Sequence, residues 1–259
     1  MAFLEQAAGR IYYEVSGPGT APALTFSNSL GTDLAMWDLQ ATHLSRSFRV
    51  LRYDGRGHGR SSIIPGPYSI EGLAQDVLSV LDASGIDRTD FCGLSLGGLI
   101  GMWLAGHAPT RLGKLVLSNT APKIGSAEQW NARIAAVRKG GMPAIVDAVL
   151  ERWYTADFRL GSPAAIEATR KSLLQTSTEG YVSSCAALRD ADLRQAISTI
   201  QVPTLIIAGI YDPATTTADG RFMADRIRGS TYVELPAAHL SNIEACDAFT
   251  MELAKFLSN

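Results

Sequence analysis

A serine between glycines is the residue in this chain best suited to covalent chemistry. The segment Gly93-Leu94-Ser95-Leu96-Gly97 matches G-x-S-x-G, follows the apolar run at residues 91–94 and precedes a helical pattern that continues to His107. A strand that turns sharply into a helix crowds any neighbouring side chain, so glycines flank the serine and its oxygen is lifted clear. An ordinary glycine-rich turn would give the same pattern. The context favours Ser95 as a nucleophile.

A serine hydroxyl needs a base, and in the strand-turn-helix context that base follows the last strand of the sheet. Of His43, His58, His107 and His239, only His239 follows the last predicted strand. His43 and His107 fall on or at the end of predicted helices. His58 lies in a glycine-rich turn, where a structural role is expected. We therefore predict His239 as the base.

The base needs an acid that fixes its tautomer, and this acid is expected between the serine and the histidine in the chain. Asp212 directly follows the predicted strand at residues 205–209. A lone aspartate before proline is also a common turn former. Asp219 and Asp225 come later, on predicted helix surfaces. The order along the chain favours Asp212.

Acyl transfer also needs two N–H donors for the oxyanion of the tetrahedral intermediate. One is expected from the backbone of Leu96, directly after the nucleophile. The second is expected in the loop after the strand at residues 23–27, which has the sequence Asn28-Ser29-Leu30-Gly31. Many hydrolases that share the G-x-S-x-G turn have His-Gly at the start of this loop. Because backbone groups donate, the different side chains need not matter, and Leu30 is the candidate.

Alternating strand and helix patterns predict the scaffold that positions these residues. The pattern indicates an α/β fold with a mostly parallel sheet and helices on both faces. Ser69 is the expected N-cap of the first long helix. Strands are predicted at residues 11–15, 23–26, 48–53, 91–94, 114–118, 203–209 and 231–235, and helices at 70–83, 95–107, 222–227 and 244–257.

Residues 121–195 interrupt this alternation. They have helical character throughout and contain no convincing strand pattern. We predict a helical cap inserted into an α/β-hydrolase core, with the core formed by residues 1–120 and 196–259. The serine motif and the cap together predict a hydrolase with a covered site.

Composition excludes several other classes of protein. The chain has 259 residues, 46% of them hydrophobic and 19% charged, with a formal charge of −2 and no cluster of lysine or arginine. Neither nucleic acid nor a membrane is therefore an expected partner. No leader or membrane-spanning pattern is evident, so a cytoplasmic location is expected. The cysteines Cys92, Cys185 and Cys246 are few and widely spaced, which predicts free thiols rather than disulfides or a metal site.

Several segments resemble the 3-oxoadipate enol-lactonases of the β-ketoadipate pathway of aromatic catabolism. The triad and Arg56-Gly57-His58-Gly59 are general to the wider superfamily, and three other segments are more particular. These segments are Ser27-Asn28-Ser29-Leu30-Gly31-Thr32-Asp33, Pro65-Gly66-Pro67-Tyr68-Ser69 and Trp130-Asn131-Ala132-Arg133-Ile134. The resemblance extends over nearly the whole chain.

The resemblance implies hydrolysis of a small anionic enol-lactone to 3-oxoadipate, through an acyl-enzyme and without a metal or other cofactor. The carboxylate of such a substrate needs a cation, and Arg133 is the expected partner because guanidinium binds carboxylate in a bidentate manner. Arg138 and Lys123 are alternatives. Trp130, and after it Trp153, are expected to line the pocket.

The fold alone leaves other functions open. Serine-dependent esterases related to cofactor-free haloperoxidases, and carbon–carbon bond hydrolases, use the same triad. A serine at the elbow disfavours haloalkane dehalogenases and epoxide hydrolases, which have a carboxylate there. A ligand receptor that keeps a hydrolase shell is the non-enzymatic alternative. The oligomeric state is not determined by these patterns.

Overall fold

Strands form the centre of the computed structural model, which describes residues 2–258 and contains one eight-stranded sheet within them. The strand order is β1-β2-β4-β3-β5-β6-β7-β8, with β2 antiparallel to both of its neighbours and the other pairs parallel. The mostly parallel sheet predicted from sequence is confirmed. The strands are β1 Ala2–Gln6, β2 Gly9–Ser16, β3 Ala23–Ser27, β4 Arg49–Tyr53, β5 Thr89–Leu94, β6 Leu112–Ser118, β7 Thr204–Gly209 and β8 Thr231–Leu235.

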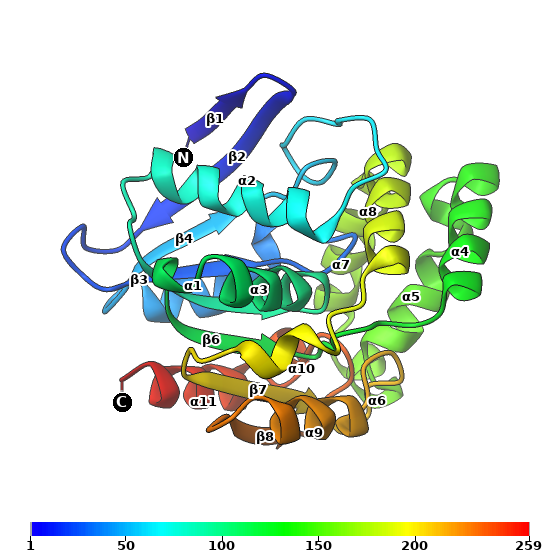
Figure 1. Ribbon diagram of the computed structural model, residues 1–259. Helices are drawn as coiled ribbons and strands as arrows, with labels where there is room; N and C mark the ends of the chain where they lie inside the picture. The colour runs from blue at the N-terminus through cyan, green and yellow to red at the C-terminus, as the bar shows by residue number, and fades with distance from the viewer. Residues whose placement is uncertain (1, 259) are drawn as a thin grey trace.

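Helices cover both faces of the sheet (Figure 1). Helices α2, α3 and α9 lie on one face, and α1 and α11 pack together on the other. The α-helices are α1 Asp38–Leu44, α2 Ile70–Ala83, α3 Leu96–His107, α4 Ala127–Gly140, α5 Val146–Trp153, α6 Ala156–Gly161, α7 Pro163–Gln175, α8 Thr178–Asp190, α9 Thr217–Arg226, α10 Ser241–Glu244 and α11 Cys246–Ser258. Short 3₁₀ turns are η1 Leu34–Trp37, η2 Pro109–Arg111, η3 Met142–Ala144 and η4 Ala196–Thr199.

Local sequence signals explain where helices α2 and α9 begin. The hydroxyl of Ser69 accepts a hydrogen bond from the Gly72 N–H, so α2 starts where its N-cap was predicted. Helix α9 starts at Thr217, five residues before the predicted helix, because Thr216 and Asp219 form a reciprocal capping box. The predicted helix at residues 244–257 is divided into α10 and α11, and the edge strand β1 was not predicted.

The parallel strands β5, β6 and β7 end at one edge of the sheet. Leu94 pairs with Ser118 across β5 and β6, and Ser118 pairs with Ile207 across β6 and β7. Loops that leave these strand ends therefore meet at the same edge, where ligands bind in open α/β sheets. The segments that contain Ser95, Asp212 and His239 follow strands that end at this edge.

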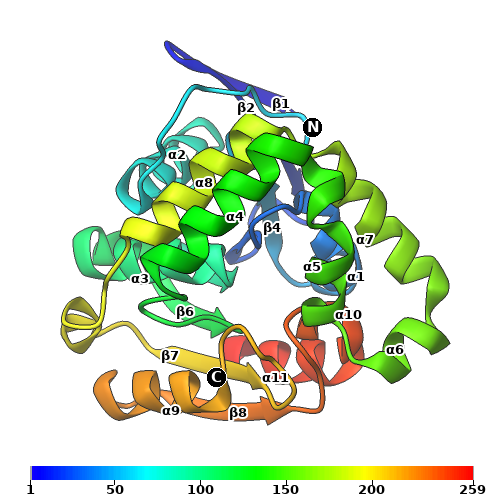
Figure 2. The same ribbon diagram turned by 90° about the vertical axis from the view of Figure 1, so that its right-hand side faces the viewer.

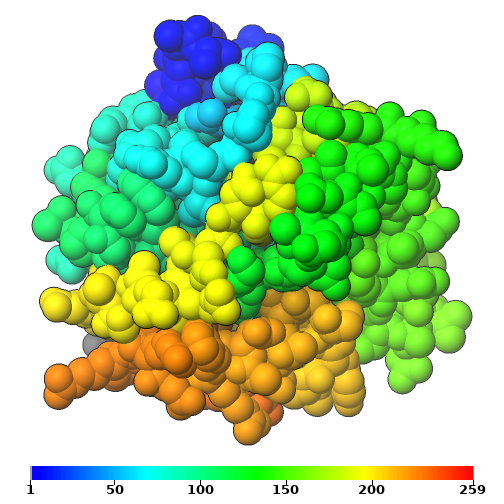
Figure 3. Space-filling model, turned by 45° about the vertical axis from the view of Figure 1, so that its right-hand side comes forward, coloured from blue at the N-terminus to red at the C-terminus, as the bar shows by residue number. Residues whose placement is uncertain are grey.

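Helices α4 to α8 lie between β6 and β7 in the chain and cover this edge. Helices α4 and α8 lie side by side in Figure 2, and their packing is among the most extensive between helices. In the space-filling view, the green atoms of this segment lie against the orange atoms of the chain after β7 (Figure 3). The division into a core and a cap at residues 121–195 stays a prediction. None of the helices within residues 2–258 has the length and apolar character needed to cross a membrane.

Candidate active site

Ser95 occupies the sharp turn between β5 and α3. Its φ of 57° and ψ of −111° place it in a strained backbone conformation, which costs a non-glycine residue about 1–3 kcal/mol. A Cβ on Gly93 would lie 2.1 Å from the Gly97 carbonyl oxygen, and one on Gly97 would lie 2.3 Å from the Ser27 carbonyl oxygen. Both flanking positions therefore require glycine. The turn holds the serine at the sheet edge.

His239 and Asp212 are in direct contact, with 2.7 Å between Nδ1 and Oδ2. The second carboxylate oxygen accepts the N–H groups of Ala214 and Thr215, at 2.8 and 3.1 Å. Burial alone would raise the pKa of Asp212, but the His239 ring and the donors from Thr215 and Asn119 hold this pKa below its ordinary value. The ionised carboxylate favours a proton on Nδ1, which leaves Nε2 of His239 able to accept one.

The backbone N–H groups of Leu30 and Leu96 donate to no acceptor among the described residues 2–258. In the loop after β3, the Gly31 N–H donates to His58 Nε2 at 3.0 Å, and in α3 the Gly97 N–H donates to the Asn28 carbonyl at 3.1 Å. Donors left open beside a nucleophile can stabilise an oxyanion.

A pocket of about 480 Å³ joins this edge to the covering helices. Ser95 and His239 both line it, although within the described part of the chain no hydrogen bond joins their side chains. The residues predicted to contact substrate line it as well, and they are Arg133 and Trp130 of α4 and Trp153 of α5. The Trp153 ring lies near the His239 ring, with 6.5 Å between centroids and 26° between the ring planes.

The alternatives to Arg133 lie elsewhere. Lys123 is paired with Asp192 at 3.5 Å, and Arg138 lines a separate hollow between α4 and α8. Arg152 of α5 lines the serine pocket and was not predicted from the sequence. No sequence signal marked it, because consecutive residues of a helix point in different directions and the packing of α5 decides which of them faces the pocket.

The geometry matches a known family of hydrolases. A family model described as the alpha/beta hydrolase fold matches residues 22–156, which is just over half of the chain. The chain belongs to the α/β-hydrolase fold family. The fold class predicted from the serine motif and from the alternation of strands and helices is therefore confirmed.

Two curated relatives of this α/β hydrolase come from Acinetobacter baylyi (strain ATCC 33305 / BD413 / ADP1). This chain is 46% identical to 3-oxoadipate enol-lactonase 2 over 92% of its own length and 89% of the relative's. It is 40% identical to 3-oxoadipate enol-lactonase 1 over 95% of its own length and 92% of the relative's. The crystal structure of the enol-lactonase from Burkholderia xenovorans LB400 superposes with a TM-score of 0.98, at 46% identity and with 100% of both chains covered. These findings confirm the resemblance noted in the sequence.

Asn119 connects three parts of the hydrolase site and was missed by the sequence analysis. It follows β6, has a left-handed φ of 42°, and donates to Asp212 Oδ2 and to the Ala238 carbonyl, both at 3.0 Å. Its side-chain oxygen accepts the hydroxyls of Ser118 and Ser241, at 3.1 and 2.5 Å. A polar residue at the end of β6, between two triad-bearing strands, was the available signal.

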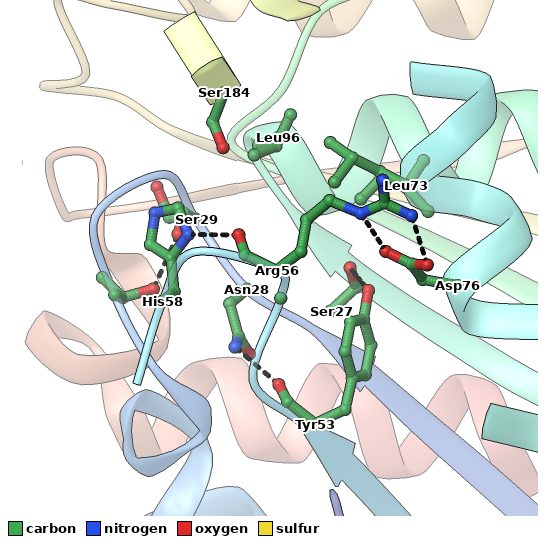
Figure 4. A pocket seen from close by; sticks show the side chains of 13 residues that line it. Ser27, Asn28, Ser29, Tyr53, Arg56, His58, Leu73, Asp76, Leu96 and Ser184 are labelled. Carbon is green, nitrogen blue, oxygen red and sulfur yellow. Dashed lines mark hydrogen bonds and ion pairs between the residues drawn. The ribbon is translucent and has the colours of Figure 1, made fainter. Parts of the chain in front are cut away.

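A small cavity lies beside the loop after β3 (Figure 4). Its volume of about 30 Å³ suits about one water molecule. Leu96 and Ser29 line it, together with the ion pair between Arg56 and Asp76. The Asn28 side chain donates to the Tyr53 carbonyl at 2.8 Å. This last bond joins the start of the loop after β3 to the end of β4.

His58 has the structural position expected for it. Burial lowers its pKa, so the ring is neutral at pH 7. Nδ1 lies 3.1 Å from the Arg56 carbonyl and carries the proton, while Nε2 accepts the Gly31 N–H. The neutral ring therefore ties the loop that contains Leu30 to the turn after β4.

Proposed function

We propose that this chain hydrolyses 3-oxoadipate enol-lactone to 3-oxoadipate in the β-ketoadipate pathway. One observation carries the proposal: Ser95, His239 and Arg133 line a single pocket, so a nucleophile and base share a cavity with a cation for the substrate's carboxylate. The relatives named as 3-oxoadipate enol-lactonases support this substrate. Its partner is thus a small anionic lactone.

In the proposed first half-reaction, the Ser95 hydroxyl attacks the lactone carbonyl while Nε2 of His239 takes its proton. Asp212 stabilises the resulting imidazolium through its bond of 2.7 Å to Nδ1. The N–H groups of Leu30 and Leu96 donate to the tetrahedral oxyanion, each contributing about 3–4 kcal/mol to transition-state stabilisation. Collapse of the intermediate breaks the ring C–O bond and leaves an acyl-enzyme whose acyl chain carries the enolate.

The second half-reaction hydrolyses the acyl-enzyme. The enolate is a better leaving group than an alkoxide, so His239 has only modest work as a general acid. His239 gives the proton it took from Ser95 to the enolate oxygen and becomes neutral again. It then removes a proton from water, which attacks the acyl carbon, and returns that proton to the Ser95 oxygen as the acyl bond breaks. The freed enol takes up a proton on carbon and becomes the ketone. Trp130 and Trp153 supply apolar walls around the ring.

Loss of the enol-lactone absorbance with purified protein tests the proposal. We expect multiple turnovers, and hydrolysis of p-nitrophenyl acetate serves as the control for an active serine. Ester hydrolysis without lactone opening would favour another esterase, and a panel including carbon–carbon bond substrates would assign it. A single slow turnover on every substrate would favour the receptor alternative. The cytoplasmic location stays a prediction.

A further inference from the structure

Two arginines from different helices line the pocket that contains Ser95. Arg133 comes from α4 and Arg152 from α5, and both are partly buried. Within residues 2–258, neither makes an ion pair with an acidic side chain. Some other cations of the same helical segment are paired, as Arg170 is with Asp147 at 2.7 Å. The pocket therefore contains positive charge that the described protein does not neutralise.

The two guanidinium groups affect each other. Burial lowers the pKa of Arg152, and the charge of Arg133 lowers it further. Both charges also act on Tyr181 of α8, where burial raises the pKa of the hydroxyl to about 12 and the arginines oppose that rise. Like charges held together in a partly dry cavity destabilise the empty pocket. A bound anion would relieve that repulsion.

We propose that Arg152 is a second specificity-determining residue, which binds the substrate's carboxylate together with Arg133. The inference rests on the proposed function, since it assigns the charge of the lactone to this part of the pocket. A carboxylate has two oxygens and about four acceptor positions, so it can accept from two guanidinium forks. Arg152 thereby selects anionic esters over neutral esters of the same size.

The test compares anionic and neutral substrates with the Arg152→Gln variant. For the enol-lactone we expect KM to rise about 10-fold with little change in kcat, because a charge-assisted hydrogen bond is lost from both ground and transition states. 4-Nitrophenyl hemisuccinate should show the same rise, and the neutral 4-nitrophenyl butyrate should show none. Equal losses on the anionic and neutral esters would overturn the proposal.

Ligand-induced stabilisation provides a readout that does not depend on turnover. We expect 3-oxoadipate to raise the melting temperature of the wild type more than that of Arg152→Gln, whatever the stability of each empty protein. Arg138→Gln is the matched control, because this arginine of α4 lines a different hollow and should respond as wild type. An unchanged ligand shift in Arg152→Gln would contradict the inference.

The aryl esters also separate the inference from the proposed function. If wild type hydrolyses the hemisuccinate but leaves the enol-lactone intact, the proposed function fails. The Arg152 proposal is then decided on the aryl esters alone. In the double variant Arg133→Gln/Arg152→Gln, the two losses should be non-additive, because both residues bind one carboxylate. Additive losses would overturn the shared-carboxylate arrangement.

Discussion

Polar side chains at the sheet edge differ from those on the helical wall of the pocket, which α4 and α5 form: the former have protein partners and the latter lack acidic ones among the described residues. At the sheet edge, Asp212 and Asn119 have hydrogen-bond partners at every side-chain oxygen. At the helical wall, Arg133 and Arg152 have no acidic partner within residues 2–258. The difference indicates two tasks: the edge holds reacting groups in fixed positions, and the wall leaves charge available to a ligand.

Mutations of the fixed residues at the sheet edge and of the arginines on the helical wall should change different kinetic constants. Groups that act only in the transition state change kcat when removed, whereas groups that bind substrate and transition state equally change KM. Variants of the sheet edge should therefore reduce kcat for every ester. Variants of the helical wall should discriminate between charged and neutral esters.

Ser95→Ala should have the largest effect at the sheet edge. We expect kcat for the enol-lactone to fall by about 10⁶-fold, because no acyl-enzyme can form. The melting temperature should not decrease, since alanine removes only an oxygen from a strained turn. Absorbance assays and a thermal melt check both results. Appreciable turnover by the variant would contradict the assignment of the nucleophile.

Asn119→Ala tests whether the edge depends on its hydrogen-bond network. Loss of the amide frees Asp212 and the Ala238 carbonyl, so we expect kcat to fall roughly 10- to 100-fold for both charged and neutral esters. Protonation of Asp212 itself should move to higher pH in a pH titration of the variant, because one donor that lowers the Asp212 pKa is absent. Asn119→Asp should be worse, since it places a like charge beside Asp212. A selective rise in KM would argue against a positioning role.

Arg133→Ala addresses the helical wall. We expect KM for the anionic lactone to rise about 10-fold, with kcat for neutral p-nitrophenyl acetate nearly unchanged. The guanidinium also lies over the Trp130 ring at 5.1 Å, so Arg133→Lys serves as the control that keeps the charge. Steady-state kinetics on both esters decide the result. Equal losses of activity on the anionic lactone and the neutral ester would contradict a role of Arg133 in binding the carboxylate.

The pH dependence of stability gives the smallest expected effect. Burial lowers the pKa of His58 below its ordinary 6.5, so the unfolded chain binds a proton that the folded chain does not. This contribution is complete above pH 6.5 and is lost as the pH falls towards the folded pKa, at up to about 1.4 kcal/mol per pH unit. The stability of His58→Gln should therefore fall less steeply between pH 6.5 and 5 in denaturant titrations. Parallel slopes would show that His58 does not titrate there.

The local chemistry of the fold was largely predictable. Helix α2 spans the predicted residues 70–83 because its N-cap and apolar periodicity are both local. The strand β1 was missed because its side chains alternate only between partial burial and exposure, so its pairing with β2 is what defines it. The division of the last helix falls at Ala245, whose φ of −114° and ψ of 46° are not helical.

The sequence by itself determined the local shape of the turn at Ser95, since a Cβ on Gly93 would meet the Gly97 carbonyl four residues along the chain. The need for glycine at position 97 comes from the Ser27 carbonyl of β3, which only the fold brings near. Chain order predicted His239 and Asp212 over their competitors, and the two side chains are in contact at 2.7 Å. Only the tertiary structure placed Asn119 between them and turned Arg152 into the pocket beside Arg133. These positions depend on how β6 and α5 pack against distant segments, and packing between distant segments leaves no fixed spacing in a single sequence.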